Sequence, residues 1–135
     1  MNSFYIALAV GFGGFFGAIS RFYLSAFVNK NFAFSSSNFL FSLPIGTLFV
    51  NLIGSFLIGI LFSFLSSNEN ISEYFKLIII TGFLGALTTY STFAYESLVL
   101  LQNEKYLTAF LNIGFNAFGT VLAVALGFYL YKIVS

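Results

Sequence analysis

Hydrophobic residues fill four long stretches of the chain, and short polar stretches separate them. A helix needs about 20 mainly apolar residues to cross a hydrocarbon layer of about 30 Å, and each stretch is long enough. None has the short alternating pattern of a membrane barrel, and an open sheet would leave backbone groups unpaired in lipid. The pattern therefore predicts an all-α membrane protein with four transmembrane helices in a single domain, residues 1–135. The predicted spans cover residues 4–28, 44–65, 75–101 and 107–133.

Composition narrows the functions that such a chain can perform. Only 7% of the 135 residues are charged and 59% are hydrophobic, whereas roughly 25% of residues are charged in soluble domains. The sequence contains no cysteine or histidine, which removes disulfides, thiolate nucleophiles, imidazole bases and the commonest zinc ligands. Three of the glutamates, Glu69, Glu73 and Glu104, lie in or beside predicted linkers. An intramembrane enzyme would lack a recognisable base, so we expect no enzymatic activity.

The segments that flank the spans contain no sign of an additional domain. Pro44 stands where the second span begins, and proline is tolerated in a first helical turn because its missing N–H would have no partner there. The linkers NKNFAFSSSN, SSNENISE and QNEK are too short to fold alone. No Lys or Arg precedes the first apolar run, so we do not expect a cleaved signal peptide.

The lysines are almost evenly divided between the two sides of a four-span arrangement. Lys76 and Lys132 fall on one side and Lys30 and Lys105 on the other, with Arg21 inside the first span. Because an excess of Lys and Arg sets the orientation of membrane proteins, this chain has little preference. One hypothesis is that it inserts both ways and that two copies pack antiparallel. The alternative is a single orientation set by weak cues.

Arg21 is the most conspicuous polar residue of the first span. Gly14, Gly17 and Ala18 share its helix face, and Gly13 forms a small-xxx-small pair with Gly17. A second backbone can approach such a face closely and shelter the guanidinium. Alternatively, Arg21 anchors the membrane interface at a helix end.

Polar stripes with a four-residue spacing run along the second and fourth spans. They consist of Thr47, Asn51, Ser55 and Gly59 in the second span and of Asn112, Asn116 and Thr120 in the fourth. An asparagine amide has two N–H donors and one acceptor oxygen, so Asn51 can join two helices or donate to a passing anion. The two stripes suggest a polar path.

The third span contains the stretch TGFLGALTTYSTFAYES, residues 81–97, which is unusually rich in glycine and hydroxyl groups. Glycine weakens a helix, and Ser and Thr side chains compete for backbone partners, so we expect the helix to break here. A broken membrane helix needs neighbouring protein or an aqueous cavity to satisfy the freed groups, and unwound carbonyls commonly hold a cation. The alternative is a tightly packed small-residue interface. Glu96 follows closely, either as a functional carboxylate or as an end-of-helix charge.

Three segments, GGFFGAISRF, GTLFVNLIGSFLIG and GFLGALTTYSTFAYE, resemble signature segments of the Fluc (CrcB) fluoride channels, and the resemblance covers all four spans in order. It implies a dual-topology antiparallel homodimer in a bacterial or archaeal inner membrane that exports cytoplasmic fluoride passively through two pores. The implied partners are the fluoride ion, a second copy of the chain and the lipid bilayer, and no nucleic acid.

The resemblance also assigns roles to single residues. Asn51 resembles the pore-lining asparagine of the family, and Arg21 its vestibule arginine. Gly85 and Thr88 match a helix break whose carbonyls, from both subunits, hold a structural Na⁺. The remaining implied pore positions are Phe93 as the second pore ring, Ser91 and Thr92 as hydroxyls beside the rings, and Asn112, Asn116 and Thr120 as a polar track.

One position departs from the family pattern, because Tyr90 stands where the first pore phenylalanine is expected. Either ring can turn its positive edge toward an anion, but tyrosine adds a hydroxyl that can donate to fluoride or narrow the path. Two other classes of small membrane protein share some of these features. A small multidrug transporter is expected to carry a glutamate in its first span, and this chain has none before Glu69. A non-conducting membrane subunit would also use small-residue faces to pack helices.

Overall fold

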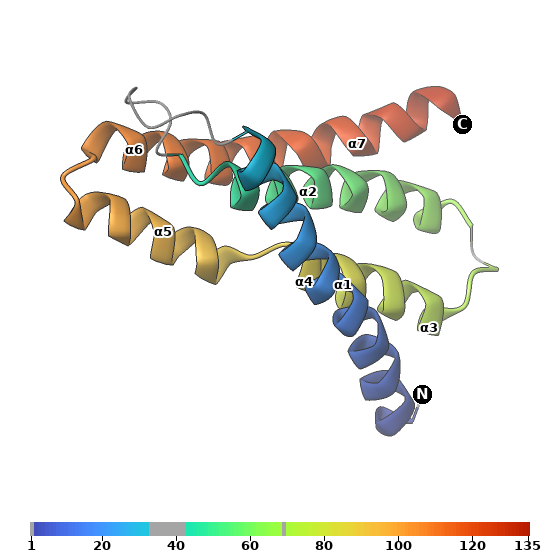
Figure 1. The fold of residues 1–135 in the computed structure, drawn as a ribbon. Coiled ribbons are helices and arrows are strands. Elements are labelled where there is room, and N and C mark those ends of the chain that lie inside the picture. Colours follow the sequence, from blue (N-terminus) through green and yellow to red (C-terminus); the bar gives the residue numbers. More distant parts are fainter. Residues whose placement is uncertain (1, 33–42, 69) are drawn as a thin grey trace.

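The computed structural model describes residues 2–32, 43–68 and 70–135, which form helices joined by short connections (Figure 1). The first two spans are α1 (Ser3–Phe32) and α2 (Ile45–Ser66). The third consists of α3 (Glu73–Lys76), the π-helix η2 (Leu77–Leu84), α4 (Gly85–Leu87) and α5 (Tyr90–Gln102). The fourth consists of α6 (Tyr106–Gly114), the π-helix η3 (Phe115–Gly119) and α7 (Thr120–Val134).

These four spans are each long and apolar enough to cross a membrane, so the protein is a multi-pass membrane protein. The predicted boundaries are close to the observed ones, and the largest difference is at the end of α1, which reaches Phe32 rather than residue 28. Pro44 directly precedes α2, as predicted. Most of the linker NKNFAFSSSN, and Glu69, lie outside the described residues.

The third span is broken, as its sequence predicts. Thr88 and Thr89 have extended backbone dihedrals, with φ −81° and ψ 155° at Thr88 and φ −149° and ψ 114° at Thr89. The side chain of Thr89 accepts a hydrogen bond from the Thr92 N–H at 3.2 Å and so caps the new helix α5. The break therefore divides the span into two helical arms, one before Thr88 and one after Thr89.

Two helix crossings bring backbones into direct contact. At the crossing of α1 with η2, a Cβ atom on Gly13 or Gly17 would collide with the backbone of Ile78 or Phe83. At the crossing of α2 with α7, Gly59 lies against the backbone of Val124, and Gly127 against that of Phe56, in the same way. Small residues allow this close approach, which is the main source of packing energy between helices in lipid. The predicted pair of Gly13 and Gly17 is thus a packing surface.

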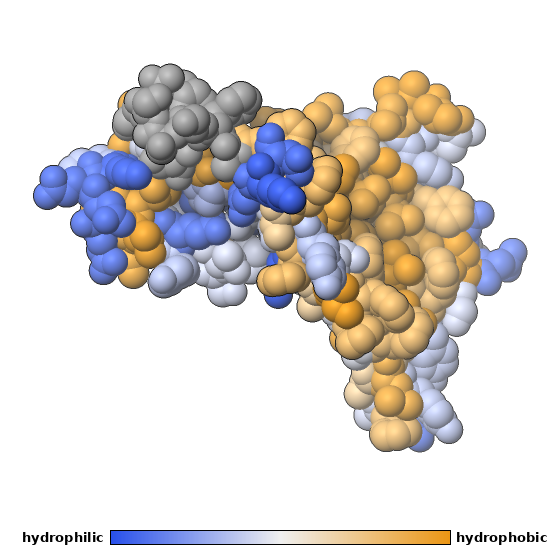
Figure 2. All heavy atoms as spheres, in the orientation of Figure 1, coloured by the Kyte–Doolittle hydropathy of each residue, from blue (hydrophilic) through white to orange (hydrophobic). Residues whose placement is uncertain are grey.

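The spans are arranged around α2, which lies beside α7 along much of its length, while α1 crosses over α2 and the first arm of the third span (Figure 1). The hairpin of α5 and α6 extends to one end of the molecule. Figure 2 shows hydrophobic residues over most of α1 and much of the right-hand part of the molecule, and hydrophilic residues at the α5–α6 turn and at the C-terminal end of α1. The exposed residues at the start of α5 include Ser91 and Thr92.

Candidate pore-lining site at the helix break

Asn51 of α2 holds the backbone at the break. Its Oδ1 accepts a hydrogen bond from the Thr89 N–H at 2.7 Å, and its Nδ2 donates to the Thr89 carbonyl at 3.1 Å. The second Nδ2 hydrogen is donated to Asn116 Oδ1 at 2.8 Å. One buried side chain therefore satisfies both backbone groups of an extended residue inside an apolar span. Asn51 uses both of its donors in these contacts.

Side-chain hydrogen bonds at the break leave two backbone carbonyls without their helical N–H donors. In an unbroken helix the Thr89 N–H would donate to the Gly85 carbonyl, but here it donates to Asn51. The Thr92 N–H would donate to the Thr88 carbonyl, but here it donates to the Thr89 hydroxyl. Gly85 and Thr88, whose carbonyls are predicted to hold a cation, are therefore the two residues whose carbonyls lose a helical N–H donor. Gly85 itself keeps helical dihedrals, so its carbonyl lies at the end of the first arm, whereas that of Thr88 belongs to the extended break.

Asn116 and Asn112 extend the polar contacts into the fourth span. Asn116 Nδ2 donates to both the carbonyl and Oδ1 of Asn112, each at 3.0 Å. Asn112 Nδ2 in turn donates to Ser97 Oγ at 2.9 Å, and Ser97 donates to the Phe93 carbonyl at 2.8 Å. The four side chains Asn51, Asn116, Asn112 and Ser97 are buried and form one relay from the break to the middle of α5.

A cavity of about 330 Å³ lies beside this relay. It is lined by Asn51, Ser55, Ile58, Thr88, Thr89, Tyr90, Phe93, Asn116, Ala117 and Thr120. The rings of Tyr90 and Phe93 meet edge to face, with 5.3 Å between their centroids and 69° between their planes. Phe93 is buried, whereas Tyr90 is 80% exposed and opens the cavity toward the surface of the chain. The lining thus combines amide, hydroxyl and aromatic groups.

Six of the residues predicted as pore or cation sites therefore meet at one cavity: Asn51, Thr88, Tyr90, Phe93, Asn116 and Thr120. Asn112 is fully buried and lies behind the cavity, where it joins α6 to α5. Ser91 and Thr92 lie on the exposed start of α5, and Gly85 is exposed just before the break.

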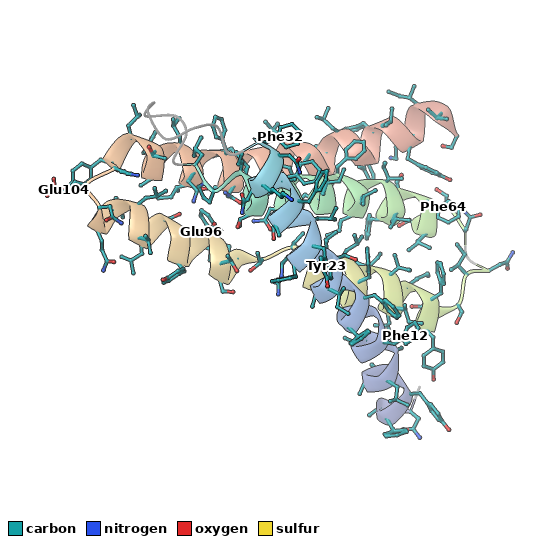
Figure 3. All side chains as sticks on the ribbon, in the orientation of Figure 1. Phe12, Tyr23, Phe32, Phe64, Glu96 and Glu104 are labelled. Atoms are coloured by element: carbon teal, nitrogen blue, oxygen red, sulfur yellow. The ribbon has the colours of Figure 1, made fainter. Side chains whose placement is uncertain are left out.

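Glu96 and Arg21 lie apart from the cavity lining. Glu96 is on α5 (Figure 3), where its Oε1 accepts a hydrogen bond from the Thr47 hydroxyl of α2 at 2.7 Å. Its Oε2 is buried and has no hydrogen-bond partner among the described residues. The carboxylate is therefore placed between helices and is not a charge at a helix end. Arg21 is partly exposed on α1, one helical turn after Gly17.

Three polar residues of the site, Ser55, Thr89 and Ser97, lay outside the set predicted to line the pore. Ser97 ends the stretch of residues 81–97, and its spacing of four from Phe93 allows its bond to the Phe93 carbonyl. Ser55 was visible as part of the stripe on the second span, and it lines the cavity. For these two serines, the sequence showed a polar group on an apolar helix but did not show what it faces.

Comparison with known proteins places this arrangement in a family. Residues 8–128 match the family model described as CrcB-like protein, Camphor Resistance (CrcB). The chain belongs to the CrcB family. A Campylobacter jejuni CrcB relative, from serotype O:6 strain 81116, is 50% identical over 125 residues, which are 93% of this chain and 96% of the relative. A Campylobacter fetus relative is 46% identical over 132 residues, 98% of each chain, and a Nitratiruptor relative is 43% identical over 130 residues, 96% of this chain and 94% of its own.

Each of these three relatives bears the name fluoride-specific ion channel FluC. The names are those of ion channels and not of enzymes. The CrcB match contains every residue of the cavity lining and of the hydrogen-bonded relay, because these all lie between residues 51 and 120. The family predicted from the three signature segments is therefore confirmed.

Proposed function

We propose that this chain is a fluoride channel that lets cytoplasmic fluoride leave a bacterial cell passively across the inner membrane. The observation that supports it most is the cavity at the break of the third span, in a chain whose relatives bear the fluoride channel name. Fluoride is small and strongly hydrated, so a pore must replace its water with donors and positive ring edges. Hydroxyl groups and the edge-to-face pair of Tyr90 and Phe93 offer such groups.

The proposed conducting unit is an antiparallel homodimer with two pores. In a single copy, Tyr90, Ser91, Thr92 and Gly85 are exposed around the break, where lipid would have to cover polar groups. A second copy would cover this face, and twofold symmetry would give each copy one cavity. The even division of lysines is what an antiparallel pair requires, because both orientations must insert.

The proposed structural cation is a sodium ion held by the carbonyls of Gly85 and Thr88. This rests on the diversion of the Thr89 and Thr92 N–H groups, which releases those two carbonyls. When bound, the ion would supply a fixed positive charge that favours anions nearby. Arg21 is proposed to add positive charge at the vestibule.

Growth in fluoride tests the proposed function in cells. A bacterium that lacks its own fluoride exporters should grow in millimolar fluoride when it expresses the parent chain. The multidrug alternative predicts protection from toxic organic cations instead, and the non-conducting alternative predicts no protection from either. Sensitivity to fluoride with verified membrane expression would contradict the proposal.

Labelling of a single cysteine tests the dual topology. The sequence has no cysteine, so Ser135→Cys introduces a unique thiol after α7. A membrane-impermeant maleimide applied to one side should label about half of the protein, because both orientations would be present. Complete labelling or none would establish a single orientation.

A further inference from the structure

Ser55 is a buried residue of the cavity lining whose hydroxyl has no hydrogen-bond partner among the described residues. Its side chain is 8% exposed, it belongs to α2, and it is one turn beyond Asn51 on the same helix face. Other buried or partly buried hydroxyls on these helices, such as Ser97 and Thr88, bond to the carbonyl four residues earlier. Ser55 makes no such bond. Its oxygen is not among the fully buried unpartnered atoms of the described residues, so the hydroxyl is accessible from the cavity and free to bond to what enters it.

The amide donors of the lining are not available for a ligand. Both hydrogens of Asn51 Nδ2 are used, one on the Thr89 carbonyl and one on Asn116 Oδ1. Both hydrogens of Asn116 Nδ2 go to oxygens of Asn112. The asparagines therefore position the break and the fourth span, and in this arrangement they offer no N–H to an anion.

Three threonine hydroxyls of the lining are also committed. Thr88 donates to the Leu84 carbonyl, Thr120 to the Asn116 carbonyl, and Thr89 to Thr92 Oγ1. Among the lining residues, which are all described, only the Ser55 and Tyr90 hydroxyls remain uncommitted, and of these two only Ser55 is buried.

We propose that the Ser55 hydroxyl is a hydrogen-bond donor to the anion in this cavity. The assignment rests on the proposed function, because it names a ligand group of the same conduction path. A hydroxyl donor beside an ion in a site largely removed from water forms a strong, charge-assisted bond. Asn51 is then a positioning residue, because its hydrogen bonds to Thr89 shape the cavity that Ser55 lines.

The test compares three purified proteins in liposomes: the parent, Ser55→Ala and Ser63→Ala. Ser63 is a matched control, because it is a buried serine two turns further along α2 and is not part of the cavity lining. Initial fluoride release is read with a fluoride electrode at fluoride concentrations well below saturation. Loss of a hydrogen bond to an ion should slow Ser55→Ala by about tenfold or more. Ser63→Ala should release fluoride at the parental rate.

The outcomes separate this assignment from the proposed function. A parent protein that releases no fluoride would overturn the proposed function, and this assignment with it. A conducting parent with Ser55→Ala at the parental rate would overturn the assignment alone, as would equal slowing in Ser63→Ala. If Ser55→Ala does not fold, Ser55→Cys replaces it, since a thiol is similar in size and a weaker donor. Parental release by Ser55→Cys would then overturn the assignment.

Discussion

The third span packs mainly against α1 before its break and mainly against α6 after it, with α2 beside both arms, and the two contacts have different chemistry. Before the break, glycines of α1 lie on the backbone of η2, and the contact is apolar and closely packed. After it, side-chain hydrogen bonds from Asn51 and Asn112 hold Thr89 and Ser97, and a cavity of about 330 Å³ remains. Close approach fills space, whereas hydrogen-bonded side chains can hold helices at a distance. The protein combines a rigid crossing with a hollow polar site in a single span.

The apolar crossing should be the more sensitive of the two regions to added volume. In Gly17→Ala the new methyl group would meet the Phe83 backbone, which cannot move aside as a side chain can. We expect a loss of at least about 2 kcal/mol in the free energy of unfolding. Gly11→Ala on the same helix is the matched control, because its methyl would meet nothing within 4 Å. Circular dichroism during thermal unfolding in detergent measures both, and equal midpoints would contradict the close crossing.

The polar region should be more sensitive to the loss of a hydrogen-bonding group. Asn51→Ala leaves the Thr89 N–H and carbonyl without their partner and should lower the free energy of unfolding by about 1–3 kcal/mol. Fluoride release in liposomes should fall by about a hundredfold or more, because the break would lose its shape. Asn31→Ala, which removes an exposed amide at the end of α1, should change neither. Parental fluoride release by Asn51→Ala would show that the break does not depend on this residue.

Tyr90→Phe tests the contribution of a single hydroxyl within the polar region. The variant keeps the ring that meets Phe93 and removes only an exposed hydroxyl, so stability should change by less than about 0.5 kcal/mol. Fluoride release should become severalfold slower if the hydroxyl contributes a donor, and the electrode assay measures it. An unchanged rate would show that the hydroxyl is idle and that the ring alone is used.

The smallest effect on fluoride release is expected outside both regions, at the turn between α5 and α6. Glu104 has a φ of 59°, and the bonds from Glu104 N to the Leu101 carbonyl and from Lys105 N to the Leu100 carbonyl form a Schellman motif. Because glycine adopts this conformation without strain, Glu104→Gly should raise the free energy of unfolding by about 1 kcal/mol. Fluoride release should stay at the parental rate. A lower unfolding midpoint would contradict the expected relief of strain.

The sequence predicted the spans well because hydropathy and length alone decide which segments cross a membrane. It also predicted that the third span breaks near Gly85 and Thr88, but not that the extended pair is Thr88 and Thr89. Their position depends on Asn51, which lies 38 residues earlier in the chain and supplies their hydrogen bonds. The π-helices η2 and η3 were likewise not predicted, since apolar periodicity does not distinguish them from α-helix.

The site was predicted as a set of residue types on helix faces. Four-residue spacing identified Asn112, Asn116 and Thr120 as one stripe, but the spacing could not show that α5 covers Asn112 while Asn116 reaches the cavity. For the same reason Ser55 was visible only as one polar residue among several. Which side of a stripe is covered depends on tertiary contacts between distant spans.

The most direct test of the central claim is ion release from liposomes that contain only the purified parent protein. Fluoride and chloride release are measured in parallel with selective electrodes, after a potassium ionophore has been added to remove the limiting membrane potential. The account predicts rapid fluoride release with negligible chloride release. Folded protein that releases neither ion, or both ions at equal rates, would contradict the claim that the cavity at the helix break is a fluoride-selective path.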